Sequence, residues 1–175
     1  MILIGLEAQY QSRHGGPVDA LSKARQKLKG SEIEIIKASD IWVTGDPKQS
    51  SLDELALSQV LCVKTQLYPV PFLALLKDIE IDMGKISTRL NAPYACELLL
   101  LSYNEEVTKN AFMSLPYPQL HTLAQFLNPI SHIAKDWVHP FMEETSEELL
   151  DRLSKQTPCL PYDDVIKIQK KKVAV

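Results

Sequence analysis

Short apolar runs at three places in the chain predict strands. They occupy residues 2–5, 60–65 and 97–103, and the last contains four consecutive leucines. Each run is too short for an ordinary helix and lacks the three- and four-residue spacing of a helix face. A continuous apolar run is typical of a strand that is covered on both faces, so we expect residues 97–103 to lie inside a sheet.

Two segments between these runs predict amphipathic helices. The first begins at Pro17, after a pair of glycines, and ends at Gly30, as proline near a helix start and glycine after its end favour. The second begins at Pro69 and ends at Gly84. Its buried stripe is expected to consist of Phe72, Leu75, Leu76 and Ile79.

One more strand is predicted where the β-branched residues 33–36 lead towards residues 41–43. Residues 44–53 form a polar segment with Gly, Pro and Ser, which predicts a loop. The resulting order is strand, helix, strand, strand, helix, strand. This is the βαββαβ order of the ferredoxin-like arrangement, so we expect an α+β fold with an antiparallel sheet and both helices packed on one face.

The residues after this core predict additional C-terminal helices. Residues 120–127 and 130–137 have helical patterns, and we expect a break at Pro129 because proline disfavours a helical residue before it. Thr145 and Glu148 form a capping box that predicts the start of a final helix.

The pattern weakens after this final helix. We therefore expect one domain over residues 1–155, followed by a C-terminal tail or an extra edge segment over residues 156–175. Within that segment, residues 165–168 predict one edge strand.

Composition narrows the classes of partner and compartment. A net charge of −3 and a pI near 5.8 give no overall basic field, so we expect neither nucleic acid nor membrane partners. No apolar run approaches the roughly 20 residues that cross a bilayer, and the first residues lack a secretory signal. Three widely spaced cysteines match neither a disulfide framework nor a zinc site. We expect a cytoplasmic monomer.

Residues 92–99 have the sequence Ala-Pro-Tyr-Ala-Cys-Glu-Leu-Leu. This segment resembles, in its place along the chain, the G-P-R-x-x-D-L-D signature of the 6-hydroxymethyl-7,8-dihydropterin pyrophosphokinase (HPPK) family of folate biosynthesis. The similarity extends over about residues 2–153. Further landmarks that occur in the family's order are Gly5, Glu80, Gly84, Leu115-Pro116-Tyr117 and Pro129.

This resemblance implies transfer of pyrophosphate from ATP to a pterin alcohol, with Mg²⁺ held by two aspartates at alternate positions of one strand. Those positions hold Glu97 and Leu99 here, which leaves Glu97 as the implied metal ligand. The resemblance also implies a catalytic role for Lys85 and ATP binding by Tyr117. The implied pterin-binding residues are Thr44, Ser58 and Phe126.

The departures from the family pattern predict impaired chemistry. A leucine side chain cannot ligate Mg²⁺, and residues that hold ATP phosphates in the family correspond here to Tyr117, Pro118 and Leu123. Pyrophosphoryl transfer depends on positioning and charge neutralisation, and each 1.4 kcal/mol lost slows it about tenfold. We expect a degenerate site that has lost most or all catalysis and acts through residual ligand binding or a protein partner.

Two alternatives stay open. An active, divergent pterin pyrophosphokinase would use other acids, such as Glu7 or Asp82, to hold Mg²⁺. A non-catalytic interaction module would instead use the cleft as a docking groove for a protein. Glu97 is accordingly either a magnesium ligand or a strand-edge carboxylate that faces solvent or pairs with Lys85.

A separate group of polar residues allows a metal hypothesis. His132, Asp136 and His139 would lie near one another on a helix, at a spacing that resembles metal ligands. The simpler interpretation is that they are surface polar groups at a helix end.

Overall fold

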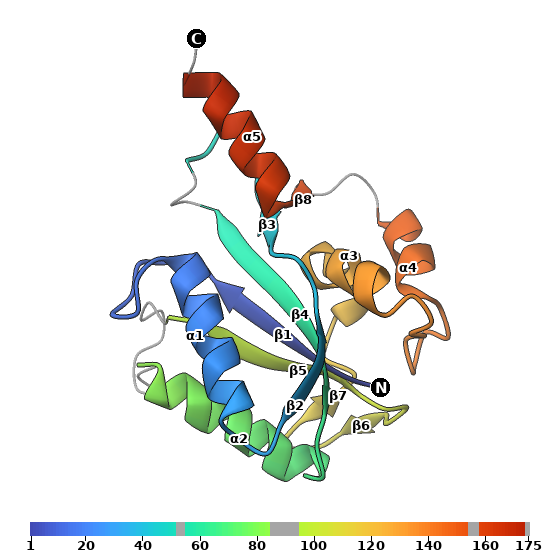
Figure 1. Cartoon of the computed structure of the whole chain (residues 1–175). Coiled ribbons are helices and arrows are strands. Elements are labelled where there is room, and N and C mark those ends of the chain that lie inside the picture. The colour runs from blue at the N-terminus through green and yellow to red at the C-terminus, as the bar shows by residue number, and fades with distance from the viewer. Residues whose placement is uncertain (52–54, 85–94, 154–157, 174–175) are drawn as a thin grey trace.

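The core of the fold is a six-stranded antiparallel sheet (Figure 1). The computed structural model describes residues 1–51, 55–84, 95–153 and 158–173. The strands of the sheet follow the order β5-β1-β4-β3-β8, and β2 also pairs with β4. Every pairing between these strands is antiparallel. Their bounds are β1 (Ile2–Ala8), β2 (Glu34–Ala38), β3 (Trp42–Thr44), β4 (Ala56–Lys64), β5 (Glu97–Tyr103) and β8 (Cys159–Pro161).

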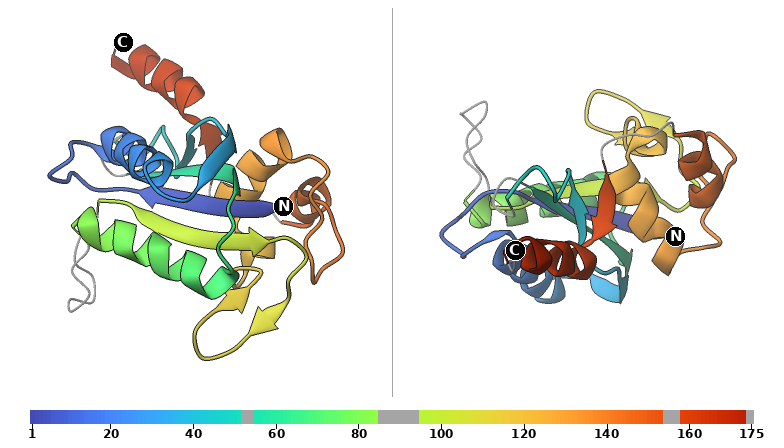
Figure 2. Two further views of the ribbon diagram at one scale, coloured as in Figure 1. Left: turned by 60° about the horizontal axis from the view of Figure 1, so that its bottom comes forward. Right: turned by 90° about the horizontal axis from the view of Figure 1, so that it is seen from above.

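Helices α1 (Pro17–Lys29) and α2 (Pro69–Asp82) cover one face of this sheet (Figure 2). Alternate residues of the central strands point to that face, as the two-residue period of a strand requires. With the inner stripes of both helices they form a large apolar core. Strand order, antiparallel pairing and helix placement confirm the predicted α+β, ferredoxin-like fold.

The opposite face carries a second apolar cluster. It is covered by the 3₁₀-helix η2 (Leu120–Thr122) and by helices α3 (Ala124–Ile133) and α4 (Ser146–Arg152). The capping box predicted at the start of α4 is present: the Thr145 N–H donates to the Glu148 carboxylate at 2.8 Å, and the Glu148 N–H donates to Thr145 Oγ1 at 3.2 Å. A short hairpin of β6 (Thr108–Lys109) and β7 (Ser114–Leu115) packs with Leu115 in the first apolar core.

The predicted helix break at Pro129 is wrong, because Pro129 lies inside α3. A proline at this position cannot donate a backbone hydrogen bond to the carbonyl of Gln125, four residues earlier. The Ser58 hydroxyl on β4 donates to that carbonyl instead, at 3.0 Å. A tertiary hydrogen bond thus replaces the one that the proline removes, and the helix continues.

The predicted edge strand at residues 165–168 is also wrong. These residues belong to helix α5 (Tyr162–Val173), and the edge strand is β8, a few residues earlier. Val165 is fully buried in the core under α1 and α2, and Lys167 pairs with Asp164 one helical turn away, so helical spacing satisfies both the apolar and the charged residues.

The single strand predicted across residues 33–43 is instead two strands, β2 and β3, which both pair with β4. They separate at Ser39, whose N–H donates to the Val60 carbonyl at 2.9 Å and whose hydroxyl accepts from the Val60 N–H at 3.0 Å. None of the helices within the described residues has the length and apolar composition needed to cross a bilayer.

Candidate functional site

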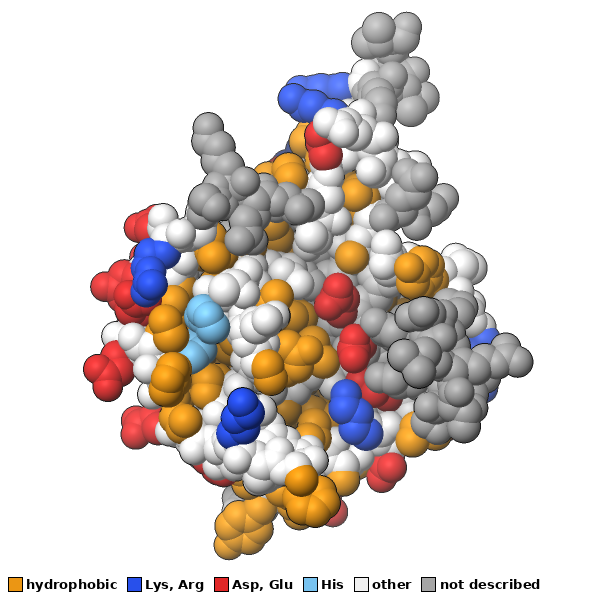
Figure 3. Space-filling model, turned by 180° about the vertical axis from the view of Figure 1, so that it is seen from behind, with side chains coloured by type: hydrophobic (Ala, Val, Ile, Leu, Met, Phe, Trp, Pro, Cys, Tyr) orange, Lys and Arg blue, Asp and Glu red, His pale blue; other side chains and the backbone are white. Residues whose placement is uncertain are grey.

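The candidate site lies on the sheet face that α1 and α2 do not cover. The strand register places Glu7 of β1 opposite Glu97 of β5 and opposite Ser58 of β4. Two positions along, Gly5 lies opposite Leu99. Directly opposed residues of antiparallel strands point to the same face, so these side chains share one surface. Acidic side chains are visible next to one another near the centre of the face in Figure 3.

Glu7 and Glu97 form a pair of neighbouring carboxylates. Burial raises the pKa of the Glu7 carboxyl above its usual value, and the negative charge of Glu97 raises it further. A shared cation or a proton would relieve this repulsion. The sequence offered Glu7 only as one of two acids that might be recruited to hold Mg²⁺. The other, Asp82, forms an ion pair with Lys27 at the end of α2.

Leu99 occupies the position two residues after Glu97 on the same strand face. Its side chain is 6% exposed and belongs to the second apolar cluster, together with Leu3, Val60 and Phe126. The surface beside Glu97 on this strand face is therefore hydrocarbon.

Two side chains of α2 hold the start of β5 in place. The Glu80 carboxylate, 1% exposed, accepts the Leu98 N–H at 2.6 Å. Lys77 donates to the Leu98 carbonyl at 2.9 Å and to the Glu80 carboxylate at 2.8 Å. Because Leu98 lies between Glu97 and Leu99, this arrangement fixes the register of both.

Two of the three predicted pterin-binding residues lie beneath the surface of the site. Ser58 is 1% exposed, and its hydroxyl is engaged with α3. Phe126 is also 1% exposed and lies directly over Gly5, where an added Cβ would come within 2.7 Å of the phenyl ring. The glycine is thus required by the close approach of the ring. Thr44, half-buried at the end of β3, lies on the same face: it is opposite Ala56 of β4, two positions from Ser58, and opposite Cys159 of β8.

Tyr117 lies at the other side of Leu99. Its N–H donates to the Leu101 carbonyl at 2.8 Å, and its side chain lines a cavity of about 130 Å³ together with Lys77 and Leu99. Lys85, the predicted catalytic residue, lies outside the described residues. The structure therefore brings Glu97, Ser58, Thr44, Phe126 and Tyr117 to one face.

The sequence analysis did not identify Lys77, and it did not assign Glu7 to a face of the sheet. The signal for Glu7 was the two-residue period of β1, which puts Leu3, Gly5 and Glu7 on one face. Only the register of the strands shows that this face is the one that carries Glu97. For Lys77 no signal was available, because its contact with β5 depends on how α2 packs.

The proposed histidine and aspartate metal site is not formed. Among the described residues, no three His, Cys, Asp or Glu side chains are grouped as metal ligands. His132 packs edge-on against Trp42, with ring centroids 5.1 Å apart, whereas His139 packs against Trp137. The cysteines remain ordinary thiols, since burial raises the pKa of Cys96 to about 12 and that of Cys159 to about 11.

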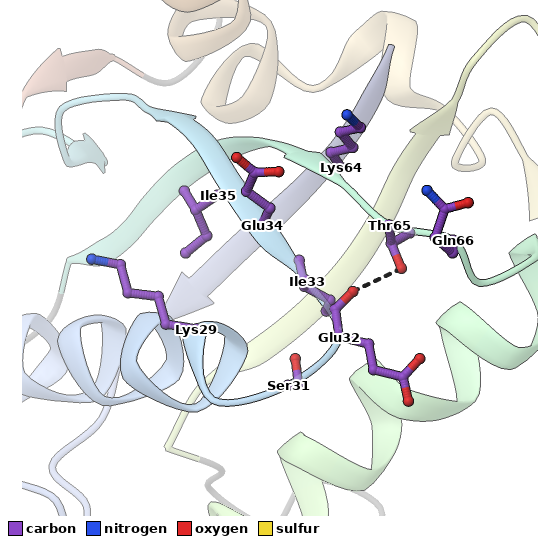
Figure 4. Close-up of a pocket in the computed structure, with 9 residues that line it drawn as sticks. All are labelled: Lys29, Ser31, Glu32, Ile33, Glu34, Ile35, Lys64, Thr65 and Gln66. Carbon is purple, nitrogen blue, oxygen red and sulfur yellow. Dashed lines mark hydrogen bonds between the residues drawn. The ribbon is translucent and has the colours of Figure 1, made fainter.

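A wider cavity of about 660 Å³ lies between the end of α1, the start of β2 and the end of β4 (Figure 4). The hydroxyl of Thr65 donates to the Glu32 carbonyl across it at 3.0 Å. Both lysines and glutamates contribute to its wall, so it presents no dominant charge. Its lining residues are Lys29, Ser31, Glu32, Ile33, Glu34, Ile35, Lys64, Thr65 and Gln66. None of the predicted site residues is among them.

Comparison with known proteins identifies relatives over most of the chain. The chain is 24% identical over 147 residues to the 2-amino-4-hydroxy-6-hydroxymethyldihydropteridine pyrophosphokinase of Aquifex aeolicus, covering 84% of this chain and 88% of that protein. It is 27% identical over 130 residues to the folic acid synthesis protein fol1 of Schizosaccharomyces pombe, covering 74% of this chain. A folic acid synthesis protein of Dictyostelium discoideum is 31% identical over 87 residues, or 50% of this chain.

The matches to the longer relatives are partial. This chain spans 17% of the length of the Schizosaccharomyces pombe protein and 13% of that of the Dictyostelium discoideum protein. The model of a protein family described as 7,8-dihydro-6-hydroxymethylpterin-pyrophosphokinase matches residues 9–135, which include β2 to β7, α1, α2 and α3. The chain therefore belongs to the HPPK family.

Proposed function

We propose that this protein is an HPPK-family member that binds a ligand at the family site but has lost efficient pyrophosphoryl transfer. The observation that carries the proposal is that Leu99, which the resemblance places at the second metal-ligand position, is packed into an apolar cluster. HPPK-family enzymes use Mg²⁺ and ATP. Mg²⁺ requires oxygen ligands in near-octahedral geometry, and the pair Glu97 and Leu99 supplies a carboxylate from one side only. The residues present do not fit the family's paired arrangement.

The side chains that cover the site also support the loss of efficient pyrophosphoryl transfer. Phe126 fills the space over Gly5, and the Ser58 hydroxyl is used to hold α3. A flat substrate could stack on Phe126 only if that ring left the apolar cluster. A small cavity of about 130 Å³ lies beside Leu99 and Tyr117 and is lined also by Lys77, whose ammonium is paired with Glu80. Binding without turnover is the function that these contacts favour.

The test is turnover with ATP, Mg²⁺ and 6-hydroxymethyl-7,8-dihydropterin, with calorimetry of MgATP binding alongside. We expect no Mg²⁺-dependent turnover from the natural chain, and the same result from Glu97→Gln. Leu99→Asp, with Leu99→Asn as the uncharged control of equal size, should introduce Mg²⁺-dependent thermal stabilisation. Turnover at an ordinary enzyme's rate that Glu97→Gln abolishes would overturn the proposal.

A second candidate function is an active, divergent pyrophosphokinase. The observation that favours it is the opposition of Glu7 and Glu97, since Mg²⁺ in phosphate-transferring sites is commonly held by one or two carboxylates and the phosphates themselves. Glu7 would then replace the carboxylate that Leu99 lacks. In that case Glu7→Gln and Glu97→Gln should each lower kcat at least tenfold, whereas Asp82→Asn, which alters the ion pair with Lys27, should leave it unchanged.

A further inference from the structure

A second cavity, of about 350 Å³, shares Ser114, Leu115, Tyr117 and Pro118 with the cavity beside Leu99. The β6–β7 hairpin, the segment after β7 and the loop that leads to α4 form its walls, which are mostly apolar. On the face that Figure 3 shows, histidine side chains lie among hydrophobic ones. The lining residues are Val107, Thr108, Lys109, Ser114, Leu115, Pro116, Tyr117, Pro118, Gln119, His121, His139 and Phe141. Its volume lies in the range of small-molecule sites.

His139 lies in this wall and carries a buried hydrogen-bond donor. Its Nδ1 accepts the N–H of Phe141 at 3.3 Å and that of Met142 at 3.1 Å. These bonds assign the ring proton to Nε2. The residue is 2% exposed, and among the described residues Nε2 has no hydrogen-bond partner. Buried donors nearly always have an acceptor, so this donor is an exception. Because Nε2 has almost no accessible surface, His139 contributes its ring, rather than this N–H, to the wall of the cavity.

The ionisation of His139 agrees with this tautomer. Burial lowers the pKa of His139, and the neighbouring His121 lowers it further. The ring is therefore neutral at neutral pH. A metal ion is an unsuitable occupant, because Nε2 would have to give up the proton that the Nδ1 hydrogen bonds place on it.

Aromatic rings and one lysine define the remaining chemistry. The His121 ring stands at 88° to that of His139, with centroids 5.9 Å apart. Phe141, 70% exposed, and Tyr117 contribute two more rings. Lys109 supplies a positive charge, and among the residues that the structure describes no Asp or Glu lines this cavity. Such a wall suits the face of a flat ring and a negatively charged substituent.

We propose that this cavity is a binding site for a small aromatic compound that carries an anionic group. The ring lies between the side chains of Tyr117, His121 and Phe141, and the anionic group faces Lys109. The inference does not rest on the proposed loss of pyrophosphoryl transfer, because of the residues in this wall only Tyr117 and Pro118 were compared with the family site from sequence, and neither Lys109 nor the histidines were.

Nuclear magnetic resonance titration tests the site with benzoate as the probe and benzamide as its neutral counterpart of the same shape. Benzoate should shift the ring Cε1–H signals of His121 and His139 in a saturable way, and benzamide should bind at least fivefold more weakly. Lys109→Gln, a change on an exposed residue, should remove that preference. Lys64→Gln, which alters the cavity at the end of β4, is the matched control and should preserve it.

Other outcomes would overturn the proposal. Equal affinity for benzoate and benzamide would remove the role of Lys109. The absence of saturable shifts at the two histidines would show that the cavity does not bind this class of compound. Phe141→Ala provides an independent check, because loss of one wall ring should weaken benzoate binding at least threefold while the control variant remains unchanged.

Discussion

The two faces of β1 differ sharply although they belong to the same seven-residue strand. On the face under α1 and α2, Ile2, Ile4, Leu6 and Ala8 are all buried among apolar side chains. On the other face the series is Leu3, Gly5 and Glu7: an apolar residue, a residue without a side chain, and an acid.

The difference shows how one sheet combines a stable core with a site. The face under α1 and α2 uses every inward position for apolar burial, which is the main favourable contribution to folding. The other face gives up apolar burial at Gly5 and Glu7, and α3 compensates only in part by placing Phe126 over the glycine. Substitutions on the two faces therefore test this contrast through their effects on the stability of the protein.

The largest effect is expected from removing one phenyl ring on each face. Phe72 on α2 and Phe126 on α3 are both almost completely buried, at 0% and 1% exposure. Phe72→Ala and Phe126→Ala should each lower the free energy of unfolding by about 3–5 kcal/mol, measured in urea. Phe112→Ala, at a residue that is 80% exposed, is the control and should change it by less than about 0.5 kcal/mol. A cost below about 1 kcal/mol for Phe126→Ala would show that the site face is not packed as a core.

A smaller loss is expected when β5 loses its attachment to α2. Glu80→Ala leaves the buried Leu98 N–H without its acceptor and should cost about 1–3 kcal/mol. Glu80→Gln keeps an acceptor oxygen and should cost less. Asp164→Ala breaks the exposed pair with Lys167 and should stay within about 1 kcal/mol. Equal effects of Glu80→Ala and Asp164→Ala in thermal melts would contradict the positioning role of Glu80.

The hydrogen bond that allows α3 to continue through Pro129 should be measurable by a double-mutant cycle. Ser58→Ala removes the donor to the Gln125 carbonyl and should cost about 0.5–1.5 kcal/mol. Pro129→Ala restores a backbone N–H that can bond to the same carbonyl, so Ser58→Ala should cost clearly less in that background. Strict additivity of the two changes would refute the compensation.

The smallest effect concerns the carboxylate pair and its pH dependence. Because the folded pKa of Glu7 is raised, its stabilising contribution is complete below the usual value of 4.5 and is lost as pH rises through the folded pKa. Glu7→Gln should therefore raise the melting temperature at pH 8 and have little effect near pH 4. Glu34→Gln, on the exposed edge strand β2, serves as the comparison. A less stable Glu7→Gln protein at pH 8 would mean that the ionised pair is neutralised by a cation.

The extent to which the sequence predicted these features can be seen in β5. Its apolar run predicted the strand, and the two-residue period put Glu97 and Leu99 on one face, as the structure shows. The neighbour that completes the carboxylate pair, Glu7, is ninety positions away in the sequence (97 − 7), and its side chain meets Glu97 only through the β1–β5 register. Local patterns carry no information on such a register.

The failed predictions have the same origin. Proline was expected to end a helix near Pro129, because within the segment nothing replaces its missing N–H, yet Ser58 of a distant strand does so. The β-branched residues 165–168 favour a strand locally, but Val165 reaches the core only in helix α5. In both cases a contact made by tertiary packing outweighed the local preference.

The sequence by itself determined the fold class and the alternation of strands and helices in the βαββαβ core, because these follow from the spacing of apolar residues. Only the tertiary structure decided that Glu7 faces Glu97, that Phe126 covers Gly5 and that His139 is buried in the wall of a cavity. Each of these depends on two segments whose distance is set by packing and strand register. Burial and the proximity of charge, which govern the pKa values of Glu7 and His139, arise only when those segments meet.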